Sequence, residues 1–178
     1  QMSIDKESAL CRRVSDGKYI EPEDEICAAQ YAMLQKRLAD NGYMQYEISN
    51  FCQPGRHSRH NSAYWNRTPY LGFGPAAHSF DGDRLRKWNI NDLEQWSAAL
   101  MQNDGNKPFW QQEKLTDNDI YNEELMLSLR TEKGVRASLL QGAEHKERLK
   151  YNPATERYYI APSDYFIADD IISDFIRT

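Results

Sequence analysis

The sequence predicts a mixed fold of helices and strands, α/β in its first part and α+β overall. A helix, a tight turn and a strand follow one another over residues 22 to 49, which is a typical α/β step. The last third instead reads as helix, helix, strand, helix, the order of a trimmed winged-helix module. The 178 residues are enough for one domain or two small ones.

The first predicted helix starts at Pro22 and ends at Gly42. Three acidic residues follow Pro22, where the positive end of a helix favours them. Apolar side chains then recur at helical spacing, at Cys27, Tyr31, Leu34 and Leu38. The next segment alternates apolar and polar residues and predicts a strand, with Met44, Tyr46 and Ile48 on one face and Gln45 and Glu47 on the other.

Two further helices are predicted from their opening residues. Asn91 and Glu94 resemble a capping box before a helix that carries Leu93, Trp96 and Leu100. Thr116 and Asp119 open the next helix, and we expect Gly134 to end it. Its apolar residues lie four apart, at Tyr121, Leu125 and Leu129. The polar segment 102–110 between the two helices is a candidate boundary.

The tail is predicted to hold a short amphipathic helix, a strand and a closing helix. The short helix starts at Arg136 and carries Leu139 and Leu140, and the strand is "RYYIAP" at 157–162. The closing helix starts near Ser163, and its inner face is formed by Ile167, Ile171, Ile172 and Phe175.

Charge and composition argue against several classes of function. The chain has 22 basic and 27 acidic residues, a net charge of -5, which argues against a general nucleic-acid binder. No apolar run approaches the roughly 20 residues of a membrane span. The three cysteines, Cys11, Cys27 and Cys52, match no clustered metal motif, and their odd number gives no closed disulfide set. A cytoplasmic location is therefore predicted.

Histidines and glycines suggest a zinc site, a dinucleotide-binding turn and a nucleophilic serine, but the neighbouring residues argue against each of them. His57 and His60 with Cys52 supply three zinc ligands, whereas a closed structural site needs four. The G-x-G-x-x-A pattern of "GFGPAA" at 72–77 has prolines before and inside it, which does not fit a dinucleotide-binding turn. Its glycines instead predict a close approach of backbone. The pair His78-Ser79 lacks a nucleophile elbow, so a polar pair at the end of a strand is the simpler interpretation.

The strongest local group is His60, Asn61, Tyr64 and Trp65. One interpretation is a buried turn, in which Asn61 caps a helix and the two aromatic residues fill the core. The other is a flat aromatic pocket with an axial imidazole for a porphyrin iron. Composition favours the packed turn without deciding between them.

Three motifs together resemble a known family. "YEISNF" at 46–51, "RHNSAYW" at 59–65 and "YLGFGPAAHSF" at 70–80 are similar, in order and spacing, to the C-terminal half of the oxygen-independent coproporphyrinogen III oxidases, which are radical S-adenosylmethionine (SAM) proteins. The similarity is greatest to the HemW-like, haem-chaperone branch. It is strong to about residue 96 and looser beyond.

The resemblance implies the C-terminal part of a radical-SAM partial TIM-like barrel over 1–112, followed by a small helical, winged-helix-like domain over 113–178. The family's C-x-x-x-C-x-x-C cluster loop is absent from the sequence, and the first residues, "QMSI", resemble the end of a strand. We therefore expect a fragment of a longer protein. Between Gly134 and the "RYYIAP" strand the chain is shorter than is usual in the family.

The resemblance also assigns roles to residues. The motif H-N-x-x-Y-W, associated with haem in the HemW branch, is intact here as His60, Asn61, Tyr64 and Trp65, with His60 as the expected ligand of haem iron. Positions that line the SAM side of the cavity in the oxidase branch correspond to Ser62, Ala63 and His78. Gly72 and Gly74 belong to the same wall, where the lack of a side chain allows close packing.

The function implied is haem-chaperone-like and belongs to porphyrin metabolism. The complete protein would carry a 4Fe-4S cluster and SAM, and could bind haem; porphyrin or coproporphyrinogen and haem-accepting proteins are the expected partners. This chain alone is predicted to be inactive, because it lacks the cluster loop.

Two alternatives remain. One is a true coproporphyrinogen III dehydrogenase. The other is a winged-helix module that binds protein or nucleic acid through residues 113–178, where Lys146, Arg148 and Lys150 form a small basic cluster. The acidity of the chain argues against nucleic acid.

Overall fold

The computed structural model describes residues 4–102 and 109–177. Its helices are α1 (Ala9–Ser15), α2 (Asp24–Asp40), α3 (Arg59–Trp65), α4 (Leu93–Gln102), α5 (Asp117–Leu129) and α6 (Ala168–Ser173), with 3-10 turns η1 (Lys146–Arg148) and η2 (Pro162–Ile167). Its strands are β1 (Met44–Gln45), β2 (Phe51–Cys52), β3 (His78–Phe80), β4 (Leu85–Asn89), β5 (Trp110–Lys114), β6 (Val135–Arg136), β7 (Lys150–Asn152) and β8 (Arg157–Tyr159). The predicted mixed class is confirmed.

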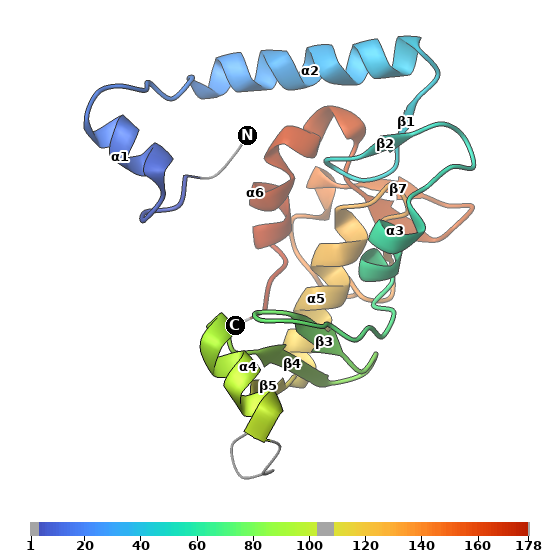
Figure 1. Cartoon of the computed structure of the whole chain (residues 1–178). Coiled ribbons are helices and arrows are strands. Elements are labelled where there is room, and N and C mark those ends of the chain that lie inside the picture. Colours follow the sequence, from blue (N-terminus) through green and yellow to red (C-terminus); the bar gives the residue numbers. More distant parts are fainter. Residues whose placement is uncertain (1–3, 103–108, 178) are drawn as a thin grey trace.

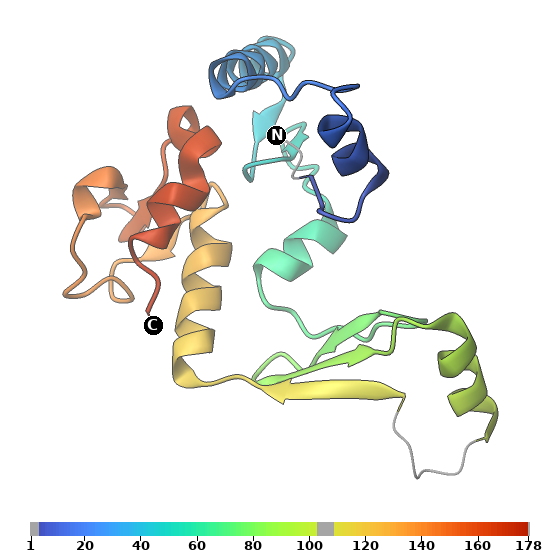
Figure 2. The same cartoon turned by 90° about the vertical axis from the view of Figure 1, so that its left-hand side faces the viewer.

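The strands form three small antiparallel sheets, with the orders β1-β2, β3-β4-β5 and β6-β8-β7. The central strand β4 pairs along its whole length with β5, from Leu85 opposite Lys114 to Asn89 opposite Trp110. This sheet and α4 extend away from α5, whereas α2 crosses the opposite end of the molecule (Figures 1 and 2).

The main hydrophobic core lies in the C-terminal part of the chain. Leu125 and Leu129 of α5 are fully buried, and they pack with residues from β6, the following turns, Ile160 and the closing helices. Thr116 and Asp119 open α5 as predicted and form a capping box, with the Thr116 hydroxyl accepting from the Asp119 N–H at 3.2 Å. The segment 115–176 therefore has a hydrophobic core of its own, and the preceding segments pack against it.

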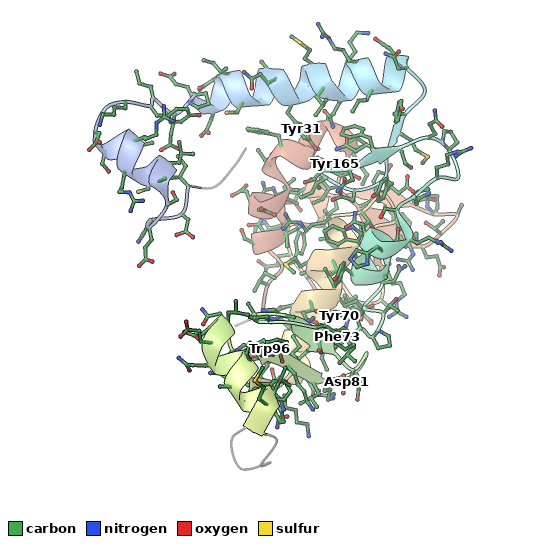
Figure 3. The ribbon with its side chains drawn as sticks, in the orientation of Figure 1. Tyr31, Tyr70, Phe73, Asp81, Trp96 and Tyr165 are labelled. Carbon is green, nitrogen blue, oxygen red and sulfur yellow. The ribbon has the colours of Figure 1, made fainter. Side chains whose placement is uncertain are left out.

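The segment between α2 and β2 docks on this base. The backbone of Tyr46 accepts from the N–H of Glu132 at 3.0 Å, and the Ile48 N–H donates to the Arg130 carbonyl at 3.1 Å. From α2, the Tyr31 hydroxyl donates to the Ile48 carbonyl at 2.6 Å and its ring lies 6.0 Å from that of Phe166. Tyr31 and Tyr165 both lie at this junction (Figure 3).

The predicted first helix and its end are confirmed by α2 and by Gly42, whose φ of 79° is the left-handed value that suits glycine. The strand that follows it is shorter than predicted, and its alternation is wrong at Glu47. This carboxylate is 1% exposed, because its backbone bridges to Thr131 instead of continuing a two-faced strand. The cap of helix α4 is Asp92, one residue after the predicted Asn91, since the Asp92 carboxylate accepts from the Gln95 N–H at 2.8 Å.

The tail differs from the prediction in three places. Helix α5 ends at Leu129, well before Gly134, which lies in the turn into β6. The expected helix from Arg136 is a strand residue followed by turns, although Leu140 is fully buried as expected. The strand at 157–159 and the closing helices are confirmed, but Ile167 is 49% exposed and Tyr165 and Ala168 are buried instead.

Two expectations concern residues at the edge of what the structure describes. The strand end at residues 1–3 and most of the candidate boundary at 102–110 lie outside the described residues. The expected domain limit after residue 112 falls inside β5, which pairs with β4. None of the helices within residues 4–102 and 109–177 has both the length and the hydrophobicity that a membrane span requires. All three cysteines are free thiols.

Candidate functional site

The short helix α3 carries the strongest motif of the sequence. Ser58 is its cap, with its hydroxyl accepting from the Asn61 N–H at 3.2 Å. The interpretation in which Asn61 caps the helix is therefore wrong. Asn61 lies within the first turn, and its side chain donates to the Tyr46 hydroxyl at 3.1 Å. This bond fixes α3 against the segment that docks on the C-terminal core.

One face of α3 is open to solvent. His60 is exposed and Tyr64 is 42% exposed, so the interpretation in which Tyr64 fills the core is also wrong. The two rings meet edge to face, with centroids 5.0 Å apart. No hydrogen bond or ion pair to the His60 ring comes from the described residues, which leaves its nitrogens available to a ligand.

Further aromatic rings continue from this face toward the sheet. Tyr64 meets Tyr70 edge to face at 5.0 Å, and Tyr70 lies 6.3 Å from the buried Phe80. The Arg86 guanidinium lies 4.5 Å from the centre of the Phe80 ring and pairs with Glu123 of α5 at 2.6 Å. The exposed rings are thus anchored at one end by a buried ring, a cation and a carboxylate, which favours a fixed aromatic surface.

The other face of α3 lines a cavity of about 620 Å³. Ser62 and Trp65 contribute to its wall, together with Tyr46, the end of α5 and the segment 131–136. His57 lies on the same wall, where its Nε2 is 3.1 Å from a Glu132 oxygen. The motif is thus divided, because His60 and Tyr64 face solvent and Ser62 and Trp65 face the cavity.

The glycine-containing segment 70–80 folds back on itself. The backbones of Tyr70 and Phe80 exchange two hydrogen bonds of 2.9 Å, and the Gly72 N–H donates to the Ser79 hydroxyl at 3.0 Å. A Cβ on Gly72 would lie 2.1 Å from the His78 carbonyl oxygen, so the predicted close backbone approach is confirmed. Gly74 has a φ of 99° and its carbonyl accepts from the Asn89 side chain at 2.8 Å.

The expected wall residues do not form one surface. His78 is exposed on β3 and stacks on Trp88, with centroids 6.1 Å apart. Ala63 is half-buried in α3, and Ser62 faces the cavity described above. Ser79 is engaged by Gly72, in agreement with a structural rather than a nucleophilic role for the His78-Ser79 pair.

The cavity also receives side chains that the sequence did not single out. Lys133 and Arg157 line it from separate segments of the C-terminal part. No local pattern marks these two residues, because the β6-β8 pairing is what brings Arg157 to the segment that carries Lys133.

The described part of the chain has no cluster of side chains that could hold a metal ion. No group of three or more histidine, cysteine or acidic side chains there is placed to hold an ion, and His57 pairs with Glu132 rather than with His60 and Cys52. Burial, with the nearby Glu132 carboxylate, raises the pKa of the Cys52 thiol and disfavours the thiolate that a metal requires. The chain's three cysteines do not fit a 4Fe-4S cluster, so no step is assigned to one here.

Known proteins resemble this chain in both sequence and structure. "Heme chaperone HemW" of Mycobacterium tuberculosis is 32% identical over 145 residues, which are 82% of this chain and 36% of that protein. "Radical S-adenosyl methionine domain-containing protein 1, mitochondrial" of Bos taurus is 32% identical over 143 residues, 76% of this chain and 32% of that protein. The chain is homologous to the HemW proteins of the radical SAM family. No protein-family model matches it.

The solved structure of coproporphyrinogen III oxidase (HemN) from Escherichia coli, a radical SAM enzyme, shares the fold with a TM-score of 0.61. The match covers 90% of this chain and 43% of that one, at 17% identity. The chain spans about a third of the length of its curated relatives. Radical SAM relatives imply a cluster and SAM in the complete protein, whereas this chain supplies none of the cluster ligands.

Proposed function

We propose that this chain takes part in haem handling and that it corresponds to the C-terminal part of a HemW-like protein. The observation that carries the proposal is the exposed, unpaired imidazole of His60 beside the Tyr64 ring at 5.0 Å. A neutral imidazole is a common axial ligand of haem iron. The relatives named "Heme chaperone HemW" support the choice of ligand.

Each residue of the exposed face has a distinct task in this proposal. His60 supplies a ring nitrogen to the iron, and Tyr64 and Tyr70 offer aromatic surface to the macrocycle. Asn61 keeps α3 in place through its bond to Tyr46. The haem iron is cargo here, and the chemistry that it supplies is coordination alone.

Haem titration of the 178-residue chain tests the proposal. We expect a saturable change in the Soret band, and we expect His60→Ala to raise the dissociation constant tenfold or more, because an axial bond is lost. His145→Ala is the matched control, since its side chain is 55% exposed on the distant segment before η1. Equal affinities of His60→Ala and the parent chain would remove His60 as the ligand.

We also propose that Ser62, Ala63, Gly72, Gly74 and His78 border the SAM side of the complete protein, although they lie on separate surfaces of this chain. The backbone approach at Gly72 supports a tight wall at this place. The chain alone is expected to be catalytically inactive, because its three cysteines lack the spacing of the cluster loop. Anaerobic incubation with coproporphyrinogen III, SAM and a reductant should give no oxidised product. Turnover would support the oxidase alternative and contradict this assignment.

A further inference from the structure

The cavity on the inner face of α3 carries an excess of positive charge. Four cationic side chains line it against two acidic ones: Arg67, Lys133, Arg136 and Arg157, and Glu124 and Glu132. The whole chain has the opposite sign, with a net charge of -5. A local reversal of charge inside a cavity favours a negatively charged occupant.

Two of these cations are not neutralised by their neighbours. Arg136 pairs with Glu124 at 2.7 Å, and Arg67 lies 3.5 Å from Glu123. In the part of the chain that the structure describes, no carboxylate pairs with Lys133 or Arg157.

The backbone holds one of the two free cations, Arg157, in place. Arg157 Nη1 donates to the Gly134 carbonyl at 2.7 Å, which holds the guanidinium beside the residue that follows Lys133. The β6-β8 pairing places Arg157 opposite Arg136 and so brings this strand to the cavity. Two donors of like charge therefore share one wall, where a single anionic group or a pair of them can bridge both.

The Trp65 side chain lines the same space. The Trp65 Nε1 atom is buried and has no hydrogen-bond partner among the described residues, although Trp65 lines the cavity. The Glu132 carboxylate, which also lines the cavity, lies 3.1 Å from the His57 Nε2 atom.

We propose that this cavity binds a small molecule carrying two carboxylates or phosphates, held by Lys133 and Arg157. Its volume of about 620 Å³ lies within the range of about 300–1,000 Å³ usual for small-molecule pockets. The site lies on the opposite face of α3 from His60. It therefore stands whether or not haem binds at His60.

Titration of the 178-residue chain with succinate and with inorganic pyrophosphate tests the site. Two-dimensional NMR resolves the indole N–H signals of the four tryptophans, and Trp65→Phe identifies the one that belongs to Trp65. We expect this signal to shift with saturation for at least one of the two probes. The probe that binds more tightly tells whether the natural ligand is a carboxylate or a phosphate. No saturable shift with either probe would overturn the proposal.

Substitutions of single cations test which side chains contribute to the affinity for the anion. Lys133→Gln should weaken binding about tenfold, the usual effect of losing one charge-assisted hydrogen bond. Arg157→Gln should weaken it at least as much, but it also removes the bond to Gly134, so Lys133→Gln is the decisive variant. Lys150→Gln, on the exposed β7 outside the cavity, is the control and should bind as the parent does. Equal affinities of Lys133→Gln and Lys150→Gln would refute the site.

Discussion

Gly134 is expected to be the most sensitive glycine of the C-terminal part. Its φ of 64° lies in the left-handed region, and a Cβ there would lie 2.1 Å from the Tyr158 carbonyl oxygen. The left-handed conformation costs an alanine about 1–2 kcal/mol. Relief of the clash requires the β6-β8 pair to shift, which adds about 1–3 kcal/mol as in overpacked cores. Gly134→Ala should therefore lower the free energy of unfolding by about 2–5 kcal/mol.

Gly142 provides the matched control for this substitution. Its φ of 79° is similar, but nothing lies within 4 Å of the position of a Cβ. Gly142→Ala should cost only the conformational part, about 1 kcal/mol. Urea unfolding followed by circular dichroism measures both variants, and the midpoint shifts give the difference at an unchanged m-value. If the two variants lose the same free energy within about 0.5 kcal/mol, the reasoning from the Tyr158 contact is refuted.

Three further predictions concern the same core and its edges. Leu125→Ala should lower the free energy of unfolding by about 2–5 kcal/mol, whereas Leu93→Ala, at a position 63% exposed, should change it by less than about 0.5 kcal/mol in the same urea assay. Thr116→Ala should cost about 0.5–2 kcal/mol through loss of the helix cap, and Thr116→Ser should recover most of it. Burial, and then the Glu132 carboxylate, raise the pKa of Tyr165 above its ordinary value of 10.0. The neutral phenol therefore stabilises the folded state fully below pH 10, and this stabilisation is lost as the pH rises toward the pKa of Tyr165 in the folded protein. Tyr165→Phe should make the fall in melting temperature at alkaline pH less steep. An unchanged slope of melting temperature against pH would contradict this.

Elements with local signals were predictable from the sequence. Helix α2 has a proline start and a glycine stop, and α5 has a capping box with apolar residues four apart, so each helix is specified within its own segment. The β3-β4-β5 sheet had no such signal. Strand β4 is half-buried at every position and β5 is mostly exposed, so neither shows the alternation that identifies a strand. Their pairing joins residues about 25 apart in the chain and becomes visible only in the structure.

The candidate site was predictable as a set of residues but not as an arrangement. The motif at 60–65 pointed to α3 correctly, whereas the direction of each side chain depends on how α3 docks. Docking is set by Tyr46 and Asn61, and Tyr46 itself is held by its backbone contact to Glu132. Lys133 and Arg157 join the site through the fold of a different segment. The sequence motif therefore identified the exposed face of α3 with His60 and Tyr64, but it did not identify the cations Lys133 and Arg157 of the inner cavity.

The geometry of α3 limits what the four motif residues can do together. Successive residues of a helix are rotated by about 100°, so Tyr64 follows His60 on nearly the same side and Trp65 lies about 140° away from it. The contacts agree, since the His60 and Tyr64 rings touch while Trp65 lines the cavity. A flat macrocycle coordinated by His60 thus meets Tyr64 and Tyr70 and cannot reach the Trp65 indole across the helix. Trp65 therefore lies on the side of α3 that lines the inner cavity, away from the proposed haem.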